Sequence, residues 1–231
     1  MKQSRYLLYI FLFILVAALG CTRNSKVTNE QSNQQEKTDH GDKIQTGDLL
    51  FVELPVDYDL IDTNYVATSD EMNLIHVAIL ENSNDTIYVI DATFAYGVDR
   101  HPIDTFYAQY TLRDGSLPKL EVRRLKDNAM AEKYVENAKQ YLGAAYDVDF
   151  APDNDMYYCS ELVGLAYLDA EGNPMFPLCE TDMTSSDGSI PRYWTQLCDM
   201  AGIDLPHGMT VFPRDIYKSD FLVEVDANLL P

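Results

Sequence analysis

Two apolar, β-branched segments separated by a short polar turn constrain the fold of this chain most strongly. The segments cover residues 74–80 and 86–90, and the sequence Glu-Asn-Ser-Asn-Asp lies between them at 81–85. Strand-forming residues on both sides of a turn-forming cluster are typical of an antiparallel hairpin. We therefore expect an antiparallel β-hairpin in this part of the chain.

The remaining patterned segments predict a mixture of strands and helices. Short strands are expected over residues 48–52, 120–125, 210–212 and 221–225. Helices are expected over residues 129–142 and 192–201, and from Cys159 or Ser160 to near Gly172, because apolar residues recur there at helical spacing. Since the helices do not alternate strictly with the strands, the pattern predicts an α+β fold rather than a doubly wound sheet.

The N-terminal end has the features of an export signal. Lys2 and Arg5 precede an apolar run over residues 7–19, which is shorter than the about 20 residues of a membrane span and typical of a signal-peptide core. The run leads into Ala18-Leu-Gly-Cys21, which resembles a bacterial lipobox with Ala18 where Leu is usual. We expect residues 1–20 to be a lipoprotein signal peptide and Cys21 to carry the lipid. The alternative is a plain secretory signal with an incidental cysteine.

The segment that follows differs in composition from the rest of the chain. Residues 22–45 are rich in Asn, Gln, Ser, Thr, Lys and Glu and contain almost nothing apolar. Such a segment buries too little surface to offset the entropy lost on ordering. We expect residues 21–45 to form a flexible, lipid-anchored tether and residues 46–231 to form one folded domain.

The acidic composition restricts the partners of the protein. The formal net charge is −20. Nucleic-acid binding needs clustered Lys and Arg, and anionic lipid attracts basic segments, so we expect neither nucleic-acid binding nor electrostatic membrane docking. The four histidines are scattered singly, and neither an EF-hand loop nor an HExxH pattern occurs. The sequence therefore indicates no metal site and no cofactor.

Cys159 has the sequence context of a reactive thiol. It lies in Tyr-Tyr-Cys-Ser-Glu-Leu-Val at 157–163, at the expected start of a helix. Unpaired amides and the positive end of the helix dipole favour the thiolate there, and the same amides can donate to an oxyanion. Two other cysteines, Cys179 and Cys198, could form a disulfide in an oxidising envelope or remain buried thiols.

His76 is the histidine best placed to act as a base. It is the only one inside an apolar strand, whereas His40 lies in the tether and His101, next to Pro102, is expected at the surface. A thiolate nucleophile usually works with an imidazole that takes and returns its proton. Asp91, at the end of the neighbouring strand, could orient that imidazole. A core histidine and a strand-end aspartate are the structural alternatives, and spacing alone does not decide between the two interpretations.

Three blocks of the sequence resemble those of NlpC-type cysteine peptidases: a Gly-Asp-hydrophobic strand, a His-Val strand and a Cys-Ser helix start. Here Gly47-Asp48 and His76-Val77 precede Cys159, so the chain resembles the circularly permuted papain-like amidases of the YiiX and YaeF type. The resemblance spans residues 46–167, and a Glu-Ala pair is expected where this chain has Asp91-Ala92. Further matching blocks are Gly97-Val98, Tyr146-Asp147 with Phe150, and Tyr158-Cys-Ser-Glu-Leu-Val163.

The resemblance implies a papain-like fold in which the cysteine helix packs on an antiparallel sheet or barrel. It also implies hydrolysis or transfer of an amide or ester acyl group through a thioester, with Cys159 as nucleophile, His76 as base and Asp91 as the third catalytic residue. Tyr146 and Tyr158 are candidates for binding substrate, although aromatic residues beside a helix are more often core. The expected partner is a peptide or amide of the cell envelope, such as a peptidoglycan stem peptide. Acidic loops at 56–71 and 169–187 suggest a substrate that bears an amine.

Three alternatives remain open at this point. Cys159 could work with His207, in the order that unpermuted enzymes use. The protein could be an acyltransferase or lipid-acyl hydrolase, or a non-catalytic envelope binding lipoprotein. In each case we expect a lipid-anchored protein on the periplasmic side of the inner or outer membrane.

Overall fold

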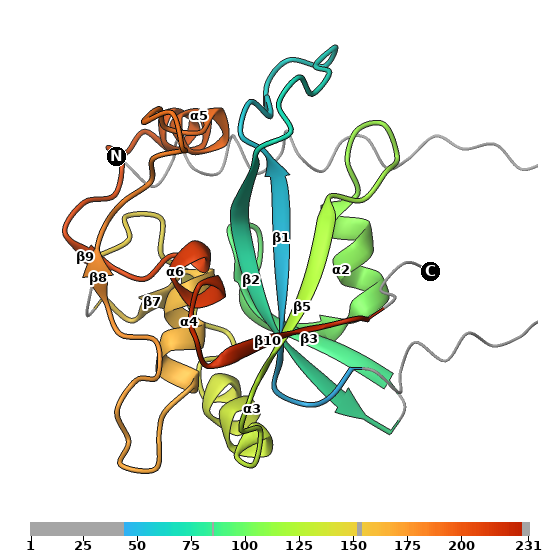
Figure 1. Ribbon diagram of the computed structural model, residues 1–231, viewed down its shortest axis with the longest axis vertical. Coiled ribbons are helices and arrows are strands. Elements are labelled where there is room, and N and C mark those ends of the chain that lie inside the picture. The colour runs from blue at the N-terminus through green and yellow to red at the C-terminus, as the bar shows by residue number, and fades with distance from the viewer. Residues whose placement is uncertain (1–43, 85, 152–153, 228–231) are drawn as a thin grey trace, which may run out of the picture. The chain divides into compact units, whose positions relative to one another are not determined.

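The computed structural model describes residues 44–84, 86–151 and 154–227 (Figure 1). The expected signal peptide, Cys21 and all but the last two residues of the expected tether lie outside the described residues. In the part of the chain that the structure describes, none of the helices has the length and apolar character needed to cross a membrane.

A six-stranded antiparallel sheet forms the centre of the domain, with the strand order β10-β5-β1-β2-β3-β4. Its strands are β1 (Asp48–Pro55), β2 (Met72–Ser83), β3 (Thr86–Thr93), β4 (Gly97–Pro102), β5 (Lys119–Leu125) and β10 (Leu222–Val225). The expected antiparallel sheet in a mixed fold is confirmed. The sheet is open rather than a closed barrel, because β10 and β4 each pair on one side only within the described residues.

The predicted hairpin is formed by β2 and β3, and both strands are longer than expected. Their ladder runs from Ser83–Thr86 to Ile79–Ile90 and ends there. Beyond this point β2 continues to pair with β1, and β3 pairs with β4. His76 and Asp91 therefore lie just past the end of the β2–β3 ladder, where the two backbones are no longer bonded to each other.

Helices cover both faces of the sheet (Figure 1). On one face α2 (Ile103–Tyr110) packs its buried Phe106 into a core that includes Leu50 and Ala78. On the other face α3 (Ala131–Lys139), α4 (Cys159–Ala166) and α6 (Pro213–Tyr217) pack over a core that includes Phe51 and Leu162. Helix α5 (Arg192–Ala201) contributes Trp194 to a third, smaller cluster. The remaining short strands are β6 (Ala145–Tyr146), β7 (Met156–Tyr157), β8 (Cys179–Glu180) and β9 (Met209–Thr210).

The helix predictions hold in position but not always in length. Helix α5 has the predicted bounds, whereas α3 and α4 are shorter. Helix α4 ends at Ala166 because Tyr167 leaves the helical conformation and stacks on Tyr134 in the core. Strand β4 and helix α2 were not predicted, since β4 contains an aspartate, an arginine and a histidine among its six residues and lacks an apolar strand pattern.

Candidate active site

Cys159 is the first residue of α4, as the sequence predicts, and its side chain is buried against the sheet. The helix start is fixed by a capping box, in which the Glu161 carboxylate accepts a hydrogen bond from the backbone N–H of Tyr158. Helix α4 packs on β2, the strand that carries His76, and the hydroxyl of Ser160 donates to the carbonyl oxygen of Val211. The thiol thus faces both the N-terminal end of a helix and the strand that carries His76.

His76 links Cys159 to Asp91. Its Nε2 lies 2.8 Å from Oδ2 of Asp91, and the charge of the Cys159 sulfur raises the pKa of the ring. Because Asp91 occupies Nε2, Nδ1 is the nitrogen that remains for the thiol. On its other side the ring packs against Tyr110 of α2, at 5.2 Å between centroids. The structure therefore brings the three residues predicted as catalytic together, with His76 bonded to Asp91 and interacting electrostatically with Cys159.

The electrostatics of these three residues favour a charged pair of Cys159 and His76. Burial by itself lowers the pKa of His76, but the negative sulfur of Cys159 and the bond to Asp91 outweigh it and raise that pKa. Burial raises the pKa of Cys159, but the positive His76 ring outweighs it and lowers that pKa. Each partner stabilises the charged form of the other, so the surroundings favour the thiolate–imidazolium pair.

The two tyrosines predicted to bind substrate lie in different surroundings. Tyr146 is near the sulfur, since its pKa is raised first by burial and then by the charge of Cys159. Tyr158 is 3% exposed and packs on Phe150, and its hydroxyl accepts a hydrogen bond of 3.3 Å from the backbone N–H of Val211. Only Tyr146 is thus half-buried beside the candidate nucleophile, whereas Tyr158 has a position in the core.

The sequence did not single out Tyr193, the second residue of α5. Burial raises the pKa of Tyr193, and the charge of Cys159 raises it further. No local sequence signal marks this residue, because α5 lies more than 30 residues after Cys159 and reaches the site only through packing.

Other candidates from the sequence do not reach Cys159. His207 is exposed, and its Nδ1 lies 3.4 Å from the carbonyl oxygen of Leu205. Cys179 and Cys198 are free thiols, so they do not form a disulfide. The expectation that His101 lies at the surface is wrong: it is 6% exposed, because β4 turns its ring under Phe106 of α2.

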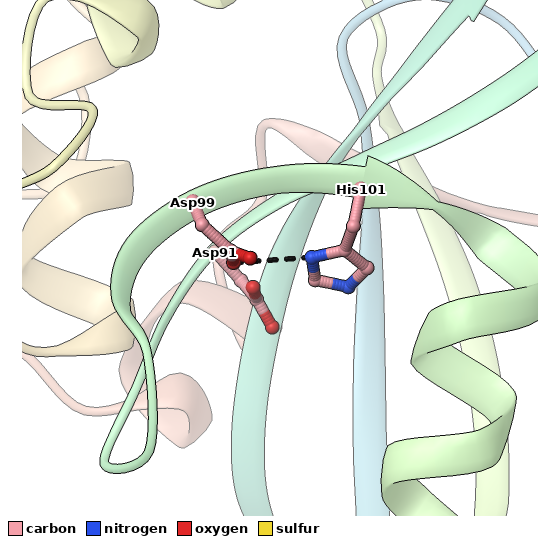
Figure 2. A group of neighbouring side chains, drawn as sticks. All are labelled: Asp91, Asp99 and His101. Atoms are coloured by element: carbon pink, nitrogen blue, oxygen red, sulfur yellow. Dashed lines mark hydrogen bonds and ion pairs between the residues drawn. The ribbon is translucent and has the colours of Figure 1, made fainter.

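A second cluster of polar groups adjoins Asp91 (Figure 2). Asp91 and Asp99 are directly opposite each other on β3 and β4, and His101 follows two residues later on the same face. One ligand atom from each side chain lies within 4.8 Å of the others, and His101 Nδ1 is 3.1 Å from Asp99 Oδ1. Two carboxylate oxygens and an imidazole nitrogen form a donor set that divalent transition-metal ions accept. No sequence pattern marks this cluster, because strand register, not sequence spacing, assembles it.

Comparisons with known proteins identify the family of this chain. The family model described as permuted papain-like amidase enzyme, YaeF/YiiX, C92 family, matches residues 43–224. The chain is 25% identical over 185 residues to the uncharacterized protein YiiX of Escherichia coli strain K12, and the match covers 78% of this chain and 85% of that protein. It also resembles the crystal structure of yiiX from Escherichia coli O157:H7, which is described as a metalloprotein. The TM-score is 0.56 and the identity 26%, over 80% of this chain and 98% of the other.

The order of the chain fits the permutation that the family description names. The strand with His76 and the strand with Asp91 both precede the helix with Cys159, and all three residues lie inside the matched region. Since this region covers most of the sequence, the chain belongs to the YaeF/YiiX, or C92, family of permuted papain-like amidase enzymes.

Proposed function

We propose that this protein is a papain-like cysteine hydrolase that cleaves an amide bond through a thioester on Cys159. The observation that carries the proposal is the buried group of Cys159, His76 and Asp91, in which His76 bonds to Asp91 at 2.8 Å and its positive ring lowers the pKa of Cys159. A structural histidine would need only one polar partner, and a core cysteine would need none. Here the imidazole bonds to a buried carboxylate and interacts with the thiol, which lies at a helix start, where thiolates are stabilised.

The proposed reaction has two half-reactions. The Cys159 thiolate attacks the carbonyl carbon of the substrate and forms a C–S bond, while the backbone N–H of Cys159 donates to the oxyanion. The His76 imidazolium then gives its proton to the leaving amine as the C–N bond breaks. In the second half, His76 takes a proton from water, which attacks the thioester and releases the acid and the thiolate. Asp91 keeps the ring oriented and stabilises its charge throughout.

The substrate that we propose is a peptide or another amide of the cell envelope. The envelope location rests on the signal-like residues 1–20 and the lipobox-like Cys21. The acidic loops give little support for an amine-bearing substrate. Asp59 is held by Arg192 and Gln196, and Glu71 binds Ser186, so these carboxylates serve internal contacts.

A metal ion also belongs in this proposal, because the solved E. coli relative is described as a metalloprotein. In this chain Asp91, Asp99 and His101 fit such an ion, since the pair of carboxylates would balance its charge and the imidazole would complete a three-ligand set. A bound divalent ion would supply positive charge beside Asp91. The reaction described above uses no step at the ion.

Thiol reactivity tests the proposed nucleophile. The full-length chain is treated with iodoacetamide at about pH 6, well below the ordinary thiol pKa of about 8.5, and each cysteine is quantified by mass spectrometry. We expect Cys159 to react much faster than Cys179, whose pKa is raised by burial and by Asp215. The advantage should disappear in His76→Ala and remain in His207→Ala.

The same experiment separates the rival assignments. If Cys159 loses its reactivity only in His207→Ala, then His207 rather than His76 is the base. If Cys159 stays inert in the wild-type protein, the catalytic proposal fails and a binding lipoprotein becomes the better account. Given a reactive thiol, product analysis with water and with amine acceptors distinguishes hydrolysis from acyl transfer.

A further inference from the structure

The carboxylate of Asp91 has two oxygens, and only one of them takes part in the bond to His76. Oδ2 accepts the hydrogen bond from His76, whereas Oδ1 is buried and has no hydrogen-bond partner among the described residues. A buried, unpaired carboxylate oxygen is costly, because it has lost its water without a replacement. Such an oxygen therefore points to a ligand that would complete its coordination.

The neighbours of Asp91 increase that cost rather than relieve it. Asp99 faces Asp91 across the β3–β4 ladder, and its pKa is raised, first by burial. His101 bonds to Asp99 through Nδ1, while its own Nε2 is buried and unpaired within the described residues. Two carboxylates and one imidazole thus lie together (Figure 2), and within the described part of the chain neither carboxylate forms a salt bridge with Lys or Arg.

We propose that Asp91, Asp99 and His101 bind one divalent transition-metal ion, with zinc as the probe, and that Asp91 is shared between this ion and His76. In this arrangement Oδ1 of Asp91, a carboxylate oxygen of Asp99 and Nδ1 of His101 are the ligands. Atoms bound tetrahedrally to a common zinc ion at about 2.0–2.2 Å lie roughly 3.3–3.6 Å from one another. One ligand atom from each of the three side chains lies within 4.8 Å of the others, so shifts of roughly 1 Å bring them to zinc-binding distances.

The ion has a route into the site. The side chain of Asp99 is 35% exposed, whereas those of Asp91 and His101 are buried. An ion can therefore enter from the Asp99 side and keep a water molecule there as its fourth ligand, as zinc sites with three protein ligands do. On the opposite side Asp91 keeps its bond to His76. The carboxylate of Asp91 then connects the ion with His76 and, through it, with Cys159.

Zinc binding to the full-length Cys159→Ala variant tests this site, measured by equilibrium dialysis with metal analysis. Removal of the thiol excludes zinc binding at Cys159 and makes the result independent of catalysis. We expect about one ion per chain. Asp99→Asn and His101→Gln should each weaken binding by at least the roughly 10–100-fold that loss of an outer-shell partner costs. Asp104→Asn and His207→Gln, which change an exposed aspartate and an exposed histidine, should bind as the parent does.

Circular dichroism, and the melting temperature measured in the presence of a chelator, verify that each variant folds without metal. If one cluster variant fails to fold, the other still decides the question, together with the zinc-dependent rise in melting temperature of the parent. Unchanged affinity in both folded cluster variants would overturn the site. So would zinc binding that the wild-type protein shows and the Cys159→Ala variant lacks, because the ion would then sit on the thiol.

Discussion

The imidazole of His76 donates from Nε2 to Oδ2 of Asp91 over 2.8 Å, and both side chains are shielded from water. The His76 side chain is 7% exposed and that of Asp91 0%. A charge-assisted hydrogen bond in such surroundings is stronger than one at the surface. The bond fixes which nitrogen of the ring faces Cys159, and the reactivity of the thiol therefore depends on a residue that does not touch it.

Asp91→Asn tests this dependence. The amide keeps the shape of the carboxylate but removes the charge that stabilises the His76 imidazolium. We expect alkylation of Cys159 at about pH 6 to slow by at least about tenfold, which corresponds to roughly one unit of thiol pKa. Asp104→Asn removes the same charge from an exposed position on α2 and serves as the control. Equal alkylation rates in Asp91→Asn and the wild-type protein would contradict the role of Asp91.

Tyr158→Phe and Tyr146→Phe separate a structural hydroxyl from one near the substrate. Removing the Tyr158 hydroxyl leaves the Val211 N–H without its partner, which should lower the free energy of unfolding by about 1 kcal/mol. Tyr146→Phe should change stability less and alter turnover of an amide substrate more, because that ring lies beside Cys159. Urea denaturation and steady-state kinetics on both variants check the prediction. The reverse pattern would place Tyr158, not Tyr146, in the substrate site.

Gly97→Ala should be strongly destabilising. Gly97 has φ +69°, and an added Cβ would collide with the carbonyl oxygen of Ala144, which accepts the hydrogen bond of Val98. In urea denaturation, we expect the free energy of unfolding to fall by roughly 3 kcal/mol or more, because of backbone strain and displacement of the segment that leads to Tyr146. Gly115→Ala is the matched control, because its φ is +84° but nothing lies within 4 Å. That variant should lose about 1 kcal/mol in the same denaturation experiment. Similar losses at the two positions would refute the steric argument.

Glu81 should contribute stability that depends on pH. Its carboxylate bonds to Arg100 at 2.7 Å and to Lys139 at 3.0 Å, and these cations outweigh burial and lower its pKa. A lowered folded-state pKa means that the stabilisation is present above the unfolded value, near pH 4.3, and is lost as the pH falls through the folded value. Because both cations are partly exposed, we expect about 0.5–1 kcal/mol at pH 7.

Glu81→Gln checks this contribution. The variant should be less stable than the wild-type protein at pH 7, and the difference should shrink as the pH falls below about 4. Thermal unfolding at several pH values measures both effects. A stability difference that stays constant across this range would show that the loss arises from packing rather than from charge.

The sequence by itself determined the elements that have strong local patterns. The β2–β3 hairpin, strands β1 and β5, and helix α5 follow from apolar periodicity and turn residues, which are local properties of the chain. Cys159 and His76 could also be identified from the sequence, one at a helix start and the other inside an apolar strand. The permuted order of the motif blocks indicated the family.

The tertiary structure decided which of these residues meet. Strand β4 was missed because its polar residues, Asp99, Arg100 and His101, face buried partners that only strand pairing supplies. The position of Asp91 between His76 and Asp99 follows from the point at which the β2–β3 ladder ends and the β3–β4 ladder continues. Sequence patterns report which face of a strand is apolar. They do not report which distant side chains share that face, because register and packing are set by the whole domain at once.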